Sequence, residues 1–121
     1  MEKTDEIIVF VRKNTWLDNV IEHGWGNGYV AIPKSHPIFN KLPKDYNEID
    51  VDIHGGLTFG EEATFIDGEI TPIIGNVIID KPYFVIGFDT VHFGDNMYKW
   101  TKEKVIEETK NLYDQILKNY F

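Results

Sequence analysis

The segment 101–120 has a helical hydrophobic period, and it follows a series of short segments that are typical of β-strands. Its apolar residues form one stripe along a helix, made of Val105, Leu112, Tyr113, Ile116, Leu117 and Tyr120. Thr101 is a suitable N-cap, and Glu103 in the first turn favours the helix dipole. Several strands followed by one terminal helix predict an α+β fold, in which a mostly antiparallel sheet packs against the C-terminal helix.

The N-terminal half supplies the first strands. Residues 6–11 are short and β-branched, which predicts a strand, although a short buried helix also fits this run. Residues 24–28 are rich in glycine, and Asn27-Gly28 is a strong hairpin signal. We therefore expect a turn at 24–28 and a returning strand at 28–33.

The clearest strand pattern is the strict polar and apolar alternation of residues 48–54. It predicts a strand with Ile49, Val51 and Ile53 on its buried face. Residues 83–88 are apolar at every position, which predicts a central strand covered on both faces. Weaker strands are expected in segments separated by Asp67-Gly68, Pro72 and Gly75, namely 57–59, 63–66 and 76–79.

Length and composition limit the classes of protein. A chain of 121 residues, 42% hydrophobic and 26% charged, is expected to form a single globular domain over 1–121. Because the chain has no cysteine, it has no disulfide, no thiol nucleophile and no zinc site built on thiolates. Any metal would have to bind to histidine and carboxylate side chains.

The formal net charge of −8 opposes binding to duplex nucleic acid and to anionic membranes. No apolar run approaches the about 20 residues that cross a bilayer. The opening residues 1–6 are polar and acid-rich, unlike the basic start of a signal peptide. We therefore expect a cytoplasmic protein that associates with neither a membrane nor duplex nucleic acid.

A first candidate site lies at the end of the alternating segment. Asp50, Asp52 and His54 share its polar face, and this face leads into Gly55-Gly56, where the backbone can approach a ligand closely. Thr58 follows this turn. The alternative is a solvated strand face that ends in an ordinary turn.

A second candidate site directly follows the apolar segment 83–88, where loops at strand ends often hold binding residues. It contains Asp89, His92 and Asp95. Alternatively, Asp89 caps a turn while His92 and Asp95 are surface groups. We expect His54 and His92 to share one cleft. With Asp89 they form a candidate set for a divalent metal, or they run general acid–base chemistry.

The charge distribution restricts the ligand. No Lys or Arg occurs between Lys44 and Lys81, so an anion at His54 needs backbone N–H groups, protonated histidine, a metal, or lysines from elsewhere in the chain. The candidates for such lysines are Lys34, Lys41, Lys44 and Lys99.

Four blocks together resemble a family of small, mostly uncharacterised phage and prophage proteins. The blocks are 28–33, His36-Pro37, 50–59 with His-Gly-Gly-Leu-Thr, and 86–95 with Gly-Phe-Asp-x-x-His-x-Gly-Asp. The likeness covers roughly residues 28–117, and the link at 62–81 is longer here than is usual in the family. The resemblance implies a site at His54, Gly55, Gly56, Asp89, His92 and Asp95, but no activity.

These observations predict a phage-type protein that binds, and thereby sequesters, a nucleotide-like or phosphorylated small molecule, as in evasion of host immune signalling in the host cytoplasm. The predicted ligand-binding residues are His54, Gly55, Gly56, Thr58, Asp89, His92, Asp95, Lys34 and His36. One alternative is a metal-dependent or general acid–base hydrolase of such a molecule. Another is an acidic module that binds a host protein, and assembly into a homo-oligomer also stays open.

Overall fold

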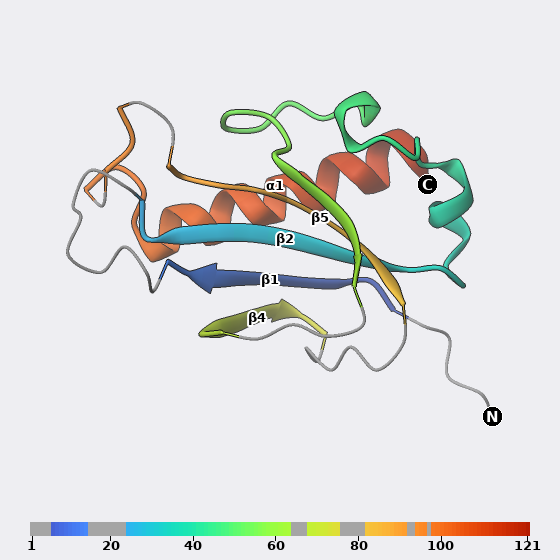
Figure 1. The fold of residues 1–121 in the computed structure, drawn as a ribbon, viewed down its shortest axis with the longest axis horizontal. Coiled ribbons are helices and arrows are strands. Elements are labelled where there is room, and N and C mark those ends of the chain that lie inside the picture. Colours follow the sequence, from blue (N-terminus) through green and yellow to red (C-terminus); the bar gives the residue numbers. More distant parts are fainter. Residues whose placement is uncertain (1–5, 15–23, 64–67, 76–81, 92–93, 97) are drawn as a thin grey trace.

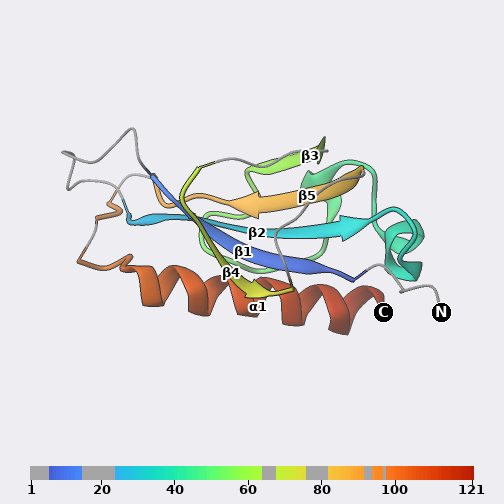
Figure 2. The same cartoon turned by 90° about the horizontal axis from the view of Figure 1, so that it is seen from below.

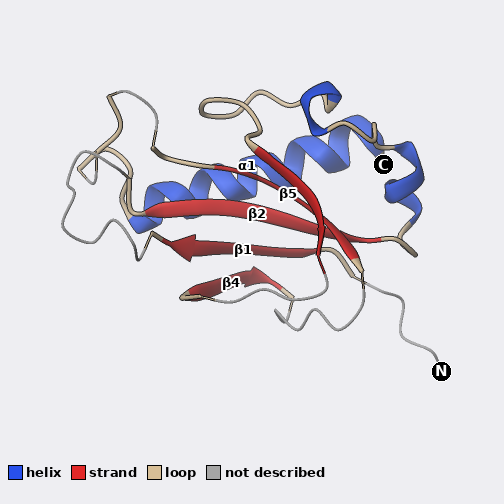
Figure 3. Cartoon of the chain, viewed as in Figure 1, coloured by secondary structure: helices blue, strands red, loops and turns tan. Residues whose placement is uncertain are grey.

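The computed structural model describes residues 6–14, 24–63, 68–75, 82–91, 94–96 and 98–121. Its elements are β1 (Ile8–Lys13), β2 (Gly26–Pro33), the short 3-10 helices η2 (Pro37–Lys41) and η3 (Tyr46–Glu48), β3 (Phe59–Ala63), β4 (Ile70–Ile74), β5 (Tyr83–Phe88) and α1 (Lys102–Tyr120). The described strands form one antiparallel sheet with the order β3-β5-β2-β1-β4, which can be followed in Figure 2, whereas Figure 1 shows the path of the chain. Figure 3 shows this sheet with the single long helix behind it. The predicted α+β fold is confirmed.

Helix α1 lies along one face of the sheet, as Figure 2 shows from below. Thr101 is the N-cap, since its side chain accepts a hydrogen bond from the N–H of Lys104 at 3.3 Å. Val105, Leu112 and Ile116 are fully buried, as the helical stripe predicts. Leu117 is only half-buried. The exposed side of the helix carries most of its charged residues, so packing of the apolar stripe orients it.

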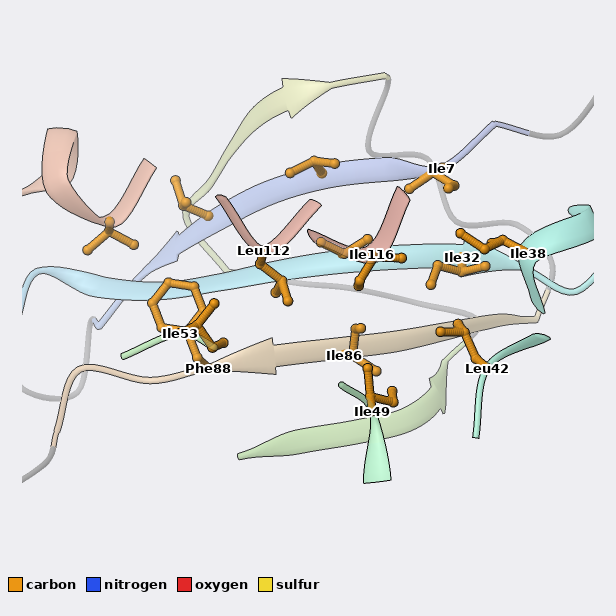
Figure 4. Close-up of a cluster of buried hydrophobic side chains, with 14 residues drawn as sticks. Ile7, Ile32, Ile38, Leu42, Ile49, Ile53, Ile86, Phe88, Leu112 and Ile116 are labelled. Carbon is orange, nitrogen blue, oxygen red and sulfur yellow. The ribbon is translucent and has the colours of Figure 1, made fainter. Parts of the chain in front are cut away.

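Two apolar clusters occupy opposite faces of the sheet because successive strand residues point to opposite sides. The larger cluster lies between the sheet and α1, and Figure 4 shows its side chains from both layers. The smaller cluster is made of Ile8, Phe10, Ala31, Tyr83 and Val85. Strand β5 contributes to both clusters, which agrees with its continuous apolar sequence. Strand β5 was predicted to be a central strand. It lies inside the sheet, between β3 and β2, although the middle position of the five belongs to β2.

The predicted turn at Asn27-Gly28 is wrong, because both residues lie inside β2. A Cβ on Gly28 would collide with Oγ1 of Thr109 on the helix and with the ring of Phe88. The glycine therefore allows α1 to approach the sheet closely, a role that a short sequence pattern does not distinguish from a turn.

The predicted strand at 48–54 is also wrong. Glu48 ends η3, and the following residues bind to α1 without joining the sheet. Ile49 and Ile53 are buried and Val51 is half-buried, so the alternation identified the buried face but not the partner of the segment. Side chains of α1, rather than a neighbouring strand, bind its backbone.

The weaker strand predictions have mixed outcomes. The one at 57–59 overlaps β3 (Phe59–Ala63) only at Phe59. Pro72 was expected to separate strands, yet it lies inside β4. Among the described strands β4 pairs only with β1, and such an edge strand tolerates the missing N–H of proline. Most of 63–66 and all of 76–79 lie outside the described residues. No helix of the described chain has the length and apolar character needed to span a membrane.

Candidate functional site

The two polar blocks meet at a side-chain pair between His54 and Asp95. Nε2 of His54 lies 2.8 Å from Oδ1 and 3.0 Å from Oδ2 of Asp95. The side chain of Asp95 is 5% exposed, whereas that of His54 is 25% exposed. An ionised carboxylate only accepts hydrogen bonds, so Nε2 is the donor in this pair. A buried carboxylate thus orients an imidazole that reaches the surface.

Two further contacts fix the position of His54. Its ring lies against the ring of Trp100, with centroids 4.2 Å apart and an interplanar angle of 33°. Its backbone N–H donates to Oε2 of Glu108 at 2.8 Å. Residues from the segment after β5 therefore contact the imidazole, and α1 binds the backbone of the same residue. We call His54, Asp95, Trp100 and Glu108 the His54 centre.

The 50–54 segment that carries His54 is attached to α1 at every second residue. Besides the bond of His54 to Glu108, the N–H of Asp50 donates to the Tyr120 hydroxyl and that of Asp52 to Oε1 of Gln115, both at 2.6 Å. The side chain of Gln115 also donates to the carbonyl of Asp52 at 2.8 Å. Polar helix side chains thus take the place of a neighbouring strand, which satisfies the backbone of a segment outside the sheet.

Asp95 is held by the path of the chain after β5. The hydroxyl of Thr90, which is fully buried, donates to the carbonyl of Gly26 at 2.7 Å, so the end of β5 stays attached to the start of β2. Ten residues after Thr90, the carbonyl of Trp100 accepts a hydrogen bond from the N–H of Trp25 at 2.8 Å. These two attachments lie before and after Asp95 in the chain.

Glycine turns lie directly next to both members of the pair. Gly55, Gly56 and Gly94 have φ angles of 69°, 75° and 89°, which favour glycine. Chain neighbours aside, no atom of the described residues lies within 4 Å of the position that a Cβ would take at Gly56 or Gly94. Both turns are therefore uncovered on that side by the described part of the chain.

Lysines from the first turn of α1 lie beside this centre. Nζ of Lys104 is 6.0 Å from the ring centroid of Trp100, and Nζ of Lys102 is 5.5 Å from that of Trp25. Lysines from elsewhere in the chain were one of the predicted ways to bind an anion at His54, beside backbone N–H groups, protonated histidine and a metal. The lysines named as candidates from the sequence were Lys34, Lys41, Lys44 and Lys99, so Lys102 and Lys104 were missed.

The structure separates the remaining predicted residues into two groups. Asp89 follows β5, and its carboxylate accepts a hydrogen bond from the N–H of Val91 at 3.3 Å, which is a turn-capping contact. Thr58 is exposed and pairs with β5 through its N–H, which donates to the carbonyl of Gly87 at 3.0 Å. Asp89 directly follows β5 and Thr58 directly precedes β3, and neither of these contacts joins them to His54 or Asp95.

Lys34 and His36 lie at the other end of the sheet. Lys34 follows β2, whose last residue pairs with the first residue of β5, and it forms an ion pair with Glu62 at 2.7 Å. Nδ1 of His36 accepts from the N–H of Ile38 at 3.1 Å and so caps η2. Neither of these contacts joins Lys34 or His36 to His54 or Asp95.

His92 lies outside the described residues, so the prediction that His54 and His92 share one cleft is not tested. Within the part of the chain that the structure describes, no three histidine, aspartate or glutamate side chains converge as metal ligands. The candidate metal set of His54, Asp89 and His92 thus remains a prediction.

Helix α1 also contributes to the centre, because Glu108 accepts a hydrogen bond from the backbone N–H of His54. The sequence analysis also missed Trp100. Trp100 directly precedes the N-cap Thr101, and the start of the helix fixes its position, so the sequence could have pointed to it. Glu108 has no such signal, because it is one of several acidic residues on the polar side of α1.

Comparison with known proteins gives no match: no family model, no curated protein and no solved structure matches this chain.

Proposed function

We propose that this chain binds a small, anionic, nucleotide-like molecule at the His54 centre. The observation that carries the proposal is the imidazole of His54, partly exposed, held by the buried carboxylate of Asp95 and stacked on Trp100. Binding sites typically combine a few oriented polar groups with apolar or aromatic surface, and this centre has both.

The anionic character of the ligand is supported by the charges around the centre. Lys102 and Lys104 lie in the first turn of α1, where the helix dipole also favours negative charge. The rings of Trp25 and Trp100 are half-buried and offer flat surface for a base. Asp95 and Glu108 add carboxylates to the same centre, so the lysines and the N-terminus of α1 are the groups that an anion would contact.

The biological role that we propose is sequestration. The resemblance to phage and prophage proteins suggests a protein that acts in the host cytoplasm, where removal of a nucleotide-derived immune signal would protect the phage. Tight binding without conversion is sufficient for this role.

Native mass spectrometry of protein purified from its host tests the proposal. We expect an added mass that corresponds to a phosphorylated small molecule, released unchanged on denaturation. His54→Ala should lose the added mass, while the exposed control variant Asp50→Ala should retain it. A bare polypeptide that also fails to bind a panel of nucleotides would contradict small-molecule binding and favour the acidic module that binds a host protein. The same spectra report any homo-oligomer.

A hydrolase is the second candidate, and the geometry of the His54 and Asp95 pair favours it specifically. A carboxylate that orients an imidazole is the arrangement of a general base and its orienting group. If the chain is an enzyme, product per protein will exceed one, and His54→Ala will lower turnover by about 10²–10⁴ while retaining binding. If it sequesters its ligand, His54→Ala will lower affinity by about 1–3 kcal/mol and no product will form.

A further inference from the structure

A second hollow lies beside the first half of β5. It has a volume of about 430 Å³ and is bordered by residues of the 34–44 segment, of β3 and of β5. None of the residues that form the His54 centre lines it. Small-molecule pockets commonly have volumes of roughly 300–1,000 Å³, so a small ligand fits this hollow. We call it the Phe84 pocket.

The segment that borders the Phe84 pocket is attached to β3 at two places. A Cβ on Gly60 of β3 would collide with the side chain of Tyr46, so this glycine allows η3 to pack directly on β3. Nζ of Lys34, which follows β2, lies 2.7 Å from Oε2 of Glu62 on β3. These attachments lie before and after the bordering residues 39–44 in the chain. The walls of the pocket are therefore in place before a ligand binds, as is usual for small-molecule sites.

The floor of the Phe84 pocket is aromatic. The rings of Phe39, from η2, and Phe84, from β5, meet edge to face with centroids 6.3 Å apart. Both side chains are half-buried, and Leu42 beside them is buried. Half-buried rings that line a hollow offer apolar surface to a flat group, which gains both burial and an aromatic contact.

The glutamates of β3 leave no unpaired carboxylate on the face that carries this pocket. Glu62 lies opposite Phe84 in the register of the two strands and shares its face. Its carboxylate is already paired with Lys34. Glu61 lies opposite Val85, whose side chain belongs to the smaller apolar cluster. Because successive strand residues point to opposite faces, the carboxylate of Glu61 points away from the pocket.

Lys44 supplies an unpaired positive charge. It lines the pocket and is exposed, and no carboxylate of the described residues pairs with it. The lining thus combines an aromatic floor, a neutral ion pair of Lys34 with Glu62, and one cation without a partner. This combination suits a ligand that has an apolar body and a single negative group, since pockets orient apolar ligands through a few polar contacts.

We propose that the Phe84 pocket binds a small organic monoanion with a flat apolar body, of the chemical class of aromatic carboxylic acids. The ring lies on Phe39 and Phe84, and the carboxylate pairs with Lys44. An ammonium group would find no unpaired carboxylate on the described lining, and an inorganic anion such as phosphate would leave the aromatic floor uncovered. This site is independent of the function proposed for the His54 centre.

Binding of matched probes to the full chain, followed by calorimetry or ligand-observed NMR, tests this proposal. The probes share an indole ring and differ in charge: indole-3-propionate is an anion, indole-3-propionamide is neutral, and tryptamine is a cation. We expect the anion to bind about two- to fivefold more tightly than the amide, the scale of one exposed ion pair, and tryptamine to bind no more tightly than the amide. Equal binding of acid and amide, tightest binding of tryptamine, or no saturable binding of the acid at millimolar concentration would overturn the proposal.

Charge-removing variants assign the partner of the carboxylate. Lys44→Gln should weaken indole-3-propionate by about two- to fivefold and leave the amide unchanged. Lys41→Gln removes an exposed lysine of η2 that does not line the pocket, and this matched control should preserve the preference for the acid. Both lysines are exposed, so the fold should tolerate both changes. If the preference for the acid persists in Lys44→Gln, the proposal is wrong.

The amide signals of the protein in NMR locate the bound acid. Those of Gly60 and Phe84 should shift during the titration with indole-3-propionate. His54→Ala should leave the affinity for the acid unchanged, because the two sites share no residue. Shifts confined to His54 and Trp100, or loss of acid binding in His54→Ala, would mean that the acid binds at the His54 centre, and the proposal would fail.

Discussion

Nε2 of His54 lies 2.8 Å from Oδ1 of Asp95, although 41 residues separate the two in the chain. The contact joins the polar end of the segment along α1 to the loop that follows β5. Because the carboxylate is almost fully buried and the imidazole is not, the pair presents one oriented polar group to the surface. The first prediction concerns this pair.

Asp95→Ala should destabilise the protein by about 1–3 kcal/mol, because it leaves Nε2 of His54 without its acceptor in a partly buried place. Asp95→Asn should cost less, since its amide oxygen still accepts the Nε2 proton. Urea denaturation measures both. Asp52→Ala is the exposed control, and a midpoint for Asp95→Ala equal to that of the control would show that the pair contributes nothing to folding.

Glu108→Ala should loosen the 50–54 segment without unfolding the domain, because Glu108 binds the N–H of His54 from the polar side of the helix. Loss of one such hydrogen bond, about 1 kcal/mol, should speed amide exchange of His54 roughly fivefold in NMR. Glu108→Gln retains an acceptor and should restore most of the protection. Glu107→Ala, on the exposed side of α1, should leave exchange at His54 unchanged.

Ile116→Ala should cost about 2–5 kcal/mol of stability, because the side chain is fully buried between α1 and the sheet and its loss leaves a cavity. Leu117→Ala removes a half-buried side chain of the same size and should cost clearly less. Thermal or urea unfolding of the two variants provides the comparison. Equal costs would mean that α1 does not pack on the sheet with the described face.

Gly28→Ala should destabilise the protein by about 1–3 kcal/mol through overpacking, since the new methyl group would collide with Thr109 and Phe88. The double variant Gly28→Ala with Thr109→Ala should recover part of the loss, because one of the two obstacles is removed. A double-mutant cycle of unfolding free energies measures this coupling. Strict additivity of the two changes would contradict the close approach of α1 to β2.

Much of the fold was determined by local pattern. The apolar stripe of 101–120 predicted which side of α1 is buried, including Val105 and Ile116, and the continuous apolar run 83–88 predicted a strand covered on both faces. These predictions succeed because the periods of helices and strands tie each side chain to a face, whatever that face meets.

Only the tertiary structure decided what each buried face meets. The alternation of 49–54 is the same whether its backbone pairs with a strand or with Glu108, Gln115 and Tyr120 on a helix, so sequence alone assigned the wrong partner. Asn27-Gly28 likewise reads as a turn until α1 is seen to approach the strand at Gly28.

The same reason explains the outcome at the candidate site. Sequence identified His54 and Asp95 by their polar blocks, but their contact, the stacking on Trp100 and the separation of Lys34 depend on which ends of antiparallel strands lie together. Strand order arises from long-range packing, and the spacing of residues along the chain does not report it.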